Sequence, residues 1–474
     1  MMTDRDVLIV GAGPSGLALG IDLARRGVDA LVVEKAGGLF PGSRGKGLQP
    51  RTMEVFDDLG VLDAIREAGS TYPVGMIWKD GRRVGEHAMF DPVEESEDSP
   101  YTEPWMVPQW RTQEILRARL GELGGRIAFG RELTGLAQDE DGVTVRFASG
   151  PGLRARYVVA ADGGRSTVRR ALGIGMTGET VDPHPMLVAD VRITGLDRDN
   201  WHLFPPGPGA GFMAVCPLAG TEDFQVVAQF PEGTEVDLSP DGVRALVAAR
   251  SHLAPEDVTQ VRWASDFRPR AALADRFRHG RVFLAGDAAH VHSPAGGQGL
   301  NTSVQDAHNL GWKLGAVLRD GAGPALLDTY EEERRPIAAE MLGVSTGVHR
   351  GEIRRGAATR QLGLGYRESS LTQESRTAPG PVRAGDRAPD ALMDGVRLFD
   401  AFRGPHWTLV AVGAQAPALP DRVRVVRAGA QEPYGRGLFL VRPDGYVGWS
   451  GDRAAGLTDY LGRFGTAQNA SLGT

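Results

Sequence analysis

Asp6-Val-Leu-Ile-Val10-Gly11-Ala-Gly13-Pro-Ser-Gly16 opens the stretch of sequence that decides the fold. The apolar run before Gly11 predicts a β-strand, and apolar residues then recur at helical spacing until Gly27. A second apolar run follows and closes on Glu34. The stretch therefore predicts a complete βαβ unit at the start of a chain of 474 residues.

Each glycine of this unit has a physical task. Gly11 permits a tight turn, Gly13 lets the backbone approach a pyrophosphate, and Gly16 lets the helix and strand pack closely. Glu34 ends the second strand, where it can accept hydrogen bonds from an adenosine ribose. Its carboxylate would repel a 2′-phosphate, so we expect the resident nucleotide to be FAD or NAD rather than NADP.

Composition limits the classes of partner. A net charge of -7 and a pI near 5.9 give no electrostatic reason to bind nucleic acid or a membrane surface, so we expect a small-molecule partner. Cys216 is the single cysteine, which excludes an intramolecular disulfide and a cysteine-based zinc site, and we expect a cytoplasmic protein without a metal. The apolar run from Val7 to Leu23 is too interrupted by glycines for a signal peptide or a membrane span. The scarcity of lysine (Lys35, Lys46, Lys79 and Lys313) is attributed to a GC-rich genome.

Two later stretches also place glycine after an apolar strand. Tyr157–Ala161 is followed by Asp162-Gly163, which fits either a nucleotide contact or a plain strand-turn-helix joint capped by Ser166 or Thr167. Residues 281–285 lead into Gly286-Asp-Ala-Ala-His-Val-His-Ser-Pro-Ala-Gly-Gly-Gln-Gly-Leu-Asn301, and a helix is predicted from Thr302 to Leu318. A helix N-terminus after a glycine-rich turn is where anionic groups are held.

The remaining segments suggest further domains. Alternating residues from 178 to 270 predict an antiparallel sheet that roofs a pocket. The side chains that could line this pocket or face a large planar ligand are Trp78, Phe90, Trp105, Trp201, Phe204, Phe212 and Met213. The charged run 331–335 predicts a solvated helix face. Residues 360–381 are interpreted as a linker, followed by a small α/β unit.

The three glycine-rich segments are Gly11–Gly16, Asp162-Gly163 and Gly286–Asn301, and we call them the first, second and third stations. Together they resemble the corresponding segments of the class A flavoprotein monooxygenases, the FAD-dependent aromatic hydroxylases. The long form of the last station is similar to the branch that acts on aromatic polyketides and antibiotics, including anthracycline-type and rifampicin monooxygenases. The resemblance implies an α/β fold with a Rossmann-like FAD-binding domain, as in para-hydroxybenzoate hydroxylase, an antiparallel-sheet substrate domain and a C-terminal thioredoxin-like domain without redox cysteines. The expected ranges are 1–177 for the first part of the FAD-binding domain, with 72–106 contributing to the substrate pocket, 178–270 for the substrate domain, 271–360 for the second FAD-binding part, and 380–474 for the thioredoxin-like domain.

The resemblance also implies roles for individual residues. Arg44 and Gln109 would contact the phosphate or ribityl region of noncovalent FAD, Asp287 a ribityl hydroxyl, and Asp162 both FAD and transient NAD(P)H. The helix N-terminus at Gly297–Asn301 would stabilise the anionic reduced flavin, whose face Pro294 and the glycines leave uncovered. The cofactor-binding residues expected are Gly11, Gly13, Pro14, Ser15, Gly16, Glu34, Lys35, Arg44, Gln109, Asp162, Gly163, Gly286, Asp287, Pro294, Gly297, Gly299, Leu300 and Asn301. The catalytic residues expected are Pro294, Gly297 and His292.

The activity implied is hydroxylation of a phenolic ring, on a polycyclic polyketide or antibiotic, in antibiotic biosynthesis or resistance. NAD(P)H would reduce FAD, dioxygen would form a flavin C4a-hydroperoxide, and the small aromatic substrate would attack its terminal oxygen. Two alternatives stay open at this point: Baeyer–Villiger oxygenation of a polyketide ketone, and a flavoprotein that binds a ligand without turnover. The expected assembly is a monomer or a homodimer.

Overall fold

The computed structural model describes residues 4–91, 94, 98–207, 211–429 and 433–465. The predicted βαβ unit is present as β1 (Asp4–Val10), α1 (Pro14–Arg25) and β2 (Ala30–Val33). β1 and β2 pair in parallel, and the buried Leu17, Ile21 and Leu23 of α1 belong to the main hydrophobic core.

An eight-stranded sheet surrounds this unit, and its main path runs β19-β20-β11-β1-β2-β8. Parallel pairing joins β20, β11, β1, β2 and β8, as in a doubly wound α/β fold. The other strands are β8 (Arg126–Ala128), β9 (Leu133–Gln138), β10 (Val143–Phe147), β11 (Leu153–Ala160), β19 (Arg278–His279) and β20 (Val282–Leu284). The three glycine-rich stations follow β1, β11 and β20, so neighbouring parallel strands deliver all three to one edge of the sheet.

Helices cover this sheet, and α1 packs against the long helix α7. The principal helices are α2 (Pro50–Asp58), α3 (Leu62–Glu67), α4 (Gln109–Glu122), α5 (Thr167–Ala171), α7 (Gly299–Gly315) and α8 (Thr329–His349). α7 starts one turn before the predicted Thr302 and passes into a π-helical turn over Ala316–Asp320. The prediction of a solvated face at 331–335 is wrong for Glu333 and Arg334, because both side chains are buried in ion pairs.

The middle of the chain forms a seven-stranded sheet in the order β17-β13-β16-β15-β14-β5-β6. The strands are β5 (Val74–Lys79), β6 (Arg82–His87), β13 (Met186–Ile193), β14 (Asn200–Phe204), β15 (Met213–Pro217), β16 (Phe224–Gln229) and β17 (Val258–Phe267), with α6 (Pro240–Arg250) beside them. The pairing is antiparallel except between β14 and β5. The sheet is therefore mixed rather than antiparallel throughout, because a hairpin from residues 74–87 joins it in parallel at β14.

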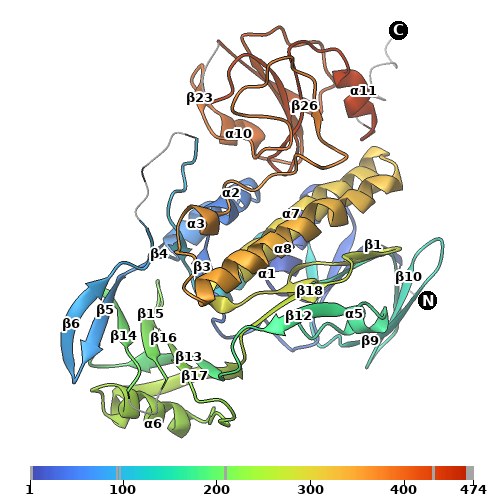
Figure 1. Ribbon diagram of the computed structural model, residues 1–474. Helices are drawn as coiled ribbons and strands as arrows, with labels where there is room; N and C mark the ends of the chain where they lie inside the picture. Colours follow the sequence, from blue (N-terminus) through green and yellow to red (C-terminus); the bar gives the residue numbers. More distant parts are fainter. Residues whose placement is uncertain (1–3, 92–93, 95–97, 208–210, 430–432, 466–474) are drawn as a thin grey trace.

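The C-terminal unit contains a five-stranded sheet in the order β22-β28-β27-β25-β26. Its elements are β22 (Gln373–Glu374), α10 (Leu398–Phe402), β25 (Trp407–Val412), β26 (Val423–Ala428), β27 (Gly437–Val441), β28 (Val447–Gly451) and α11 (Leu457–Gly462). β22 comes from the segment expected to be a linker, which is packed in place. Figure 1 shows this unit, in orange and red, seated over α2 and α7.

Small sheets and bridging elements complete the molecule. They are β3 (Gly47–Leu48) with β7 (Trp105–Met106) and β4 (Ser70–Thr71); β12 (Met176–Thr180) with β18 (Arg270–Ala274) and β21 (His290–Val291); β23 (Leu392–Met393) with β24 (Val396–Arg397); and α9 (Ala357–Arg360). Across the described ranges, no helix combines the length and the apolar character that crossing a membrane requires.

Candidate active site

In the first station the fold requires glycine at positions 11 and 16, but not at position 13. Gly11 has a φ of +112°, and a Cβ there would lie 2.2 Å from the carbonyl oxygen of Ala161. A Cβ on Gly16 would lie 2.0 Å from the oxygen of Gly11. A Cβ on Gly13 would meet no protein atom within 4 Å, so Gly13 faces open space beside the uncapped N-terminus of α1.

Glu34 is held by the backbone of this station. Its carboxylate accepts hydrogen bonds from the N–H of Ala12 at 3.0 Å and from the N–H of Ala36 at 3.0 Å. Each oxygen has further lone pairs, so the side chain can still receive hydroxyl donors. The neighbouring Lys35 is exposed, and Pro14 occupies the first turn of α1.

The second station lies against the first, since the Cβ direction of Gly11 meets Ala161 and the N–H of Asp162. Asp162 Oδ2 accepts from the N–H of Thr167 at 2.8 Å and of Val168 at 3.2 Å, while Ser166 caps α5. The other oxygen, Oδ1, is buried without a hydrogen-bond partner. Gly163 has a φ of +80° and nothing within 4 Å of its Cβ direction. The joint expected from the sequence is present, and it leaves one buried acceptor unused.

The third station is tied to the first through Ser15. A Cβ on Gly286 would lie 3.2 Å from Ser15 Oγ, and that hydroxyl itself donates to the carbonyl of Ser303 in α7. Asp287 is exposed, yet enough protein surrounds it for desolvation to raise the pKa of its carboxyl. The carboxyl is thus accessible yet set among surrounding protein groups, in the region that we call the glycine-rich cleft.

Arg44 faces the same cleft. Burial lowers the pKa of its guanidinium, against the opposing influence of the Asp287 carboxylate. The guanidinium carbon lies 5.0 Å from the ring centre of Phe40 and 5.8 Å from that of Trp263, and Nη2 donates to Ser265 Oγ at 3.3 Å. Arg44 is thereby positioned by aromatic rings while its head stays exposed.

The turn before α7 presents backbone rather than side chains. Pro294 and Gly297 are both exposed, and Gly297 has a φ of +64°. No side chain caps α7, whose first helical hydrogen bond from this turn runs from the N–H of Thr302 to the carbonyl of Gln298 at 2.9 Å. The N–H groups of Gly299, Leu300 and Asn301 therefore have no acceptor inside the helix.

The side chains of Asn301 and Gln109 hold this region together. Asn301 accepts from the N–H of Gln49 at 2.7 Å and donates to the carbonyls of Gly47 at 2.9 Å and Gly297 at 2.7 Å. Gln109 accepts from the N–H of Gly45 at 3.0 Å. Both amides position the backbone of residues 45–49 against α7, a task that the sequence analysis did not assign to them.

His292 ends a buried chain of polar groups. Its Nε2 lies 3.0 Å from His290 Nδ1, and His290 Nε2 lies 2.6 Å from Asp306 Oδ2. Asp306 also accepts from Arg334 Nε at 2.8 Å and from the N–H of Gly286 at 3.1 Å. Burial, together with His290, lowers the pKa of His292 well below its ordinary value, so the ring stays neutral near pH 7. The chain anchors the third station and was not foreseen beyond His292.

The aromatic side chains around the middle sheet form two separate groups. Tyr72 stacks on Trp201 with ring centres 5.8 Å apart and lies 5.0 Å from Phe90. Trp78 instead packs 6.2 Å from Phe204 within the middle sheet. Sequence reasoning missed Tyr72.

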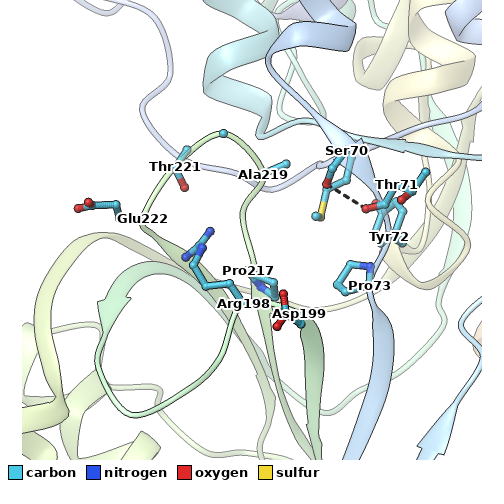
Figure 2. Close-up of a pocket in the computed structure, with 12 residues that line it drawn as sticks. Ser70, Thr71, Tyr72, Pro73, Arg198, Asp199, Pro217, Ala219, Thr221 and Glu222 are labelled. Atoms are coloured by element: carbon cyan, nitrogen blue, oxygen red, sulfur yellow. Dashed lines mark hydrogen bonds between the residues drawn. The ribbon is translucent and has the colours of Figure 1, made fainter.

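A cavity of about 600 Å³ opens beside Tyr72, next to the residues before β14 and the turn between β15 and β16. Figure 2 shows Ser70 to Pro73 on one side and Arg198, Asp199 and Pro217 on the other. Its lining includes none of the residues predicted to bind a cofactor, so the cavity is separate from the glycine-rich cleft. Within the part of the chain that the structure describes, no group of three or more His, Cys, Asp or Glu residues is arranged to hold a metal ion.

Comparison with known proteins agrees with this arrangement. A family model described as an FAD binding domain matches residues 4–345, and one described as the C-terminal region of aromatic-ring hydroxylases matches residues 382–467. The chain is 46% identical over 473 residues to a flavin-dependent monooxygenase of Mycobacteroides abscessus, covering 96% of this chain and 99% of the relative. It is 34% identical to a rifampicin monooxygenase of Streptomyces venezuelae, over 98% and 99% of the two chains. The crystal structure of aklavinone-11 hydroxylase with FAD and aklavinone superposes with a TM-score of 0.83 at 31% identity, over 98% and 99%.

The chain belongs to the FAD-binding aromatic-ring hydroxylase family. It is a flavin-dependent aromatic monooxygenase with FAD as its cofactor, and the family implies NAD(P)H and dioxygen as the other reactants.

Proposed function

We propose that this enzyme hydroxylates a phenolic ring of a polycyclic polyketide or a related antibiotic. The observation that carries the proposal is the convergence of three glycine-rich stations on one cleft that adjoins the mixed middle sheet. Relatives named for rifampicin, anhydrotetracycline and aklavinone support a large aromatic substrate.

The residues present fit FAD. Gly13 offers an open approach for the pyrophosphate, and Glu34 retains acceptor capacity for the adenosine ribose. Asp287 and Arg44 would contact the ribityl and phosphate groups, and the unpaired Oδ1 of Asp162 would find a donor there. FAD supplies the redox chemistry and the activation of dioxygen when it is bound.

The N-terminus of α7 would supply positive electrostatic potential to the bound cofactor. Its free N–H groups at Gly299, Leu300 and Asn301 and the positive end of the helix dipole would stabilise negative charge by roughly 0.3–2 kcal/mol. Pro294 and Gly297 leave an open face on which an aromatic ring can lie. Asn301 contributes by fixing the backbone that presents these groups.

The proposed function also implies how the chain divides into domains. We interpret residues 1–177 and 271–360 as the FAD-binding domain, 178–270 with 72–106 as the substrate domain, and 380–474 as a thioredoxin-like domain. The mixed sheet of the C-terminal unit supports the last assignment, and Cys216 lies outside it, which leaves it no dithiol chemistry.

The test is a panel of phenolic, anthraquinone, tetracyclic and ansamycin compounds offered to the FAD-loaded enzyme with NADPH or NADH. We expect at least one compound to accelerate NAD(P)H oxidation and to yield a product heavier by one oxygen atom, with a new hydroxyl carbon by NMR. Oxygen inserted next to a ketone would instead identify ring oxygenation. Accelerated oxidation that yields only hydrogen peroxide across the panel would contradict the substrate class proposed.

A further inference from the structure

The aromatic rings of Phe90, Tyr72 and Trp201 lie in a row that ends at β14 of the middle sheet. Phe90 lies 5.0 Å from Tyr72, and Tyr72 stacks on Trp201 at 5.8 Å with an interplanar angle of 29°. All three side chains are half-buried, so each retains an accessible part. We call this set the Phe90–Tyr72–Trp201 ladder.

Lys46 lies at the Trp201 end of the ladder. Its ammonium is 4.4 Å from the ring centre of Trp201 and donates a hydrogen bond to Gln225 Oε1, while Gln225 Nε2 donates to the carbonyl of Ser43. The side chain is only 9% exposed. Burial lowers the pKa of this lysine, and Cys216 and Asp190 act on it in the opposite sense.

Arg355 lies at the Phe90 end. Its guanidinium carbon is 5.9 Å from the ring centre of Phe90, and Nε and Nη2 donate to the carbonyl of Ala295 at 3.1 and 2.8 Å. Ala295 belongs to the turn Pro294–Gly296 that precedes α7. Arg355 therefore connects the ladder to the backbone proposed to lie beside the flavin.

The two cations lack an acidic partner in contact. Within the described ranges, no carboxylate lies within 4.0 Å of either Lys46 or Arg355. Three other buried cations do contact a carboxylate: Lys313 pairs with Glu333 at 2.7 Å, Arg334 with Asp306 at 2.8 Å and Arg442 with Glu333 at 2.6 Å. The buried Arg169 instead donates to two backbone carbonyls. A buried charge with no counterion in contact is costly, so the buried Lys46 and the half-buried Arg355, set beside half-buried aromatic rings, form a site suited to receive an anion.

We propose that Lys46 and Arg355 bind an acidic oxygen substituent, a carboxylate or an ionised phenolic hydroxyl, of an aromatic substrate that stacks on the Phe90–Tyr72–Trp201 ladder. This inference rests on the proposed function and names the charge of its substrate. Lys46 is the specificity-determining residue, because it is held by a neutral amide and an indole face rather than by an acid. Arg355 is the positioning residue, because two of its donors remain on Ala295.

The test compares two probes of one shape, anthraquinone-2-carboxylate and anthraquinone-2-carboxamide, in titrations that follow the absorbance of FAD in the holoenzyme. We expect the carboxylate to bind at least about tenfold more tightly than the carboxamide, as one charge-assisted hydrogen bond predicts. Lys46→Met should abolish this preference while the FAD content stays at the wild-type level, and Lys46→Arg should restore it.

Two further variants keep the test decisive if Lys46→Met folds poorly. Gln225→Glu gives Lys46 an acidic partner in place and should weaken carboxylate binding, whereas Lys79→Met on the exposed end of β5 should change nothing. Equal binding of the two probes by the wild type overturns the inference. A preference that depends on Arg198, in the cavity beside Tyr72, instead of on Lys46 also overturns it. A protein that fails to bind FAD or to oxygenate any phenol contradicts the proposed function itself, which is a separate result.

Discussion

Arg442 in the C-terminal unit forms a two-point ion pair with Glu333 of α8, at 2.6 and 2.9 Å, with both side chains buried. Lys313 of α7 donates to the same carboxylate at 2.7 Å, and Asp444 accepts from Trp312 at 3.1 Å. The pair of Arg442 with Glu333 and the bond from Trp312 to Asp444 thus form only when the C-terminal unit sits on α7 and α8.

Arg442→Met should therefore destabilise the protein by about 3–5 kcal/mol, because Glu333 and Asp444 would stay buried with less compensating charge. Urea denaturation followed by circular dichroism measures the change. The control is Arg367→Met, which removes an exposed pair with Asp386 and should cost about 1 kcal/mol or less. Equal losses of unfolding free energy in the two variants would contradict a larger contribution from the buried ion pair.

Asp306 links the third station to α8, and Asp306→Asn tests that link. Burial opposes its ionisation, but His290 and Arg334 hold the pKa of this carboxyl below its ordinary value. The variant would leave Arg334 buried without its charged partner and weaken the anchor on the N–H of Gly286. We expect a loss of about 3–5 kcal/mol in stability together with weaker FAD retention. A variant that loses stability but retains FAD with unchanged affinity would separate the ion pair from the station.

Asp190 gives a pH-dependent prediction. Burial raises the pKa of its carboxyl from 3.8 to about 6, so between these values the unfolded chain releases a proton that the folded protein keeps. The folded state therefore loses stability as pH rises through this window, by up to about 3 kcal/mol, and the loss is complete above pH 6. The stability of Asp190→Asn relative to wild type should rise from pH 4 to pH 6 and then level off. A difference between Asp190→Asn and wild type that does not change with pH would contradict the assignment.

Asp287→Ala should weaken FAD binding without unfolding the protein, because this carboxyl is accessible and no hydrogen bond of the fold depends on it among the described contacts. Loss of one hydrogen bond to a charged group predicts an increase in Kd of about 10- to 100-fold. Fluorescence titration of the apoprotein with FAD measures it, with Asp63→Ala on the exposed side of α3 as the control. An unchanged Kd would remove Asp287 from the cofactor site.

The sequence was sufficient where the information is local. Strand, turn and helix patterns around Gly11 and Gly286 specify the ends of neighbouring parallel strands, so their convergence could be predicted. Contacts between distant segments could not: Glu333 resembled a surface charge because its partner Arg442 lies in another unit, more than a hundred residues away.

The burial of two of the few lysines could not be predicted from the sequence either. The scarcity of lysine was given no mechanism in the sequence, yet Lys46 and Lys313 are both buried. Nothing in their neighbouring residues distinguishes them from the exposed Lys35 and Lys79, because burial is decided by the packing of separate domains.

The most direct test of the cofactor site compares FAD binding by Gly13→Val and Gly121→Val. A side chain at either position meets no protein atom within 4 Å of its Cβ, so both variants should fold, but only Gly13 faces the cleft. We predict that the wild type and Gly121→Val bind FAD noncovalently in a one-to-one ratio, and that Gly13→Val folds with the same circular dichroism spectrum and binds at least about 100-fold more weakly. A folded Gly13→Val protein that binds FAD like the wild type would contradict the site.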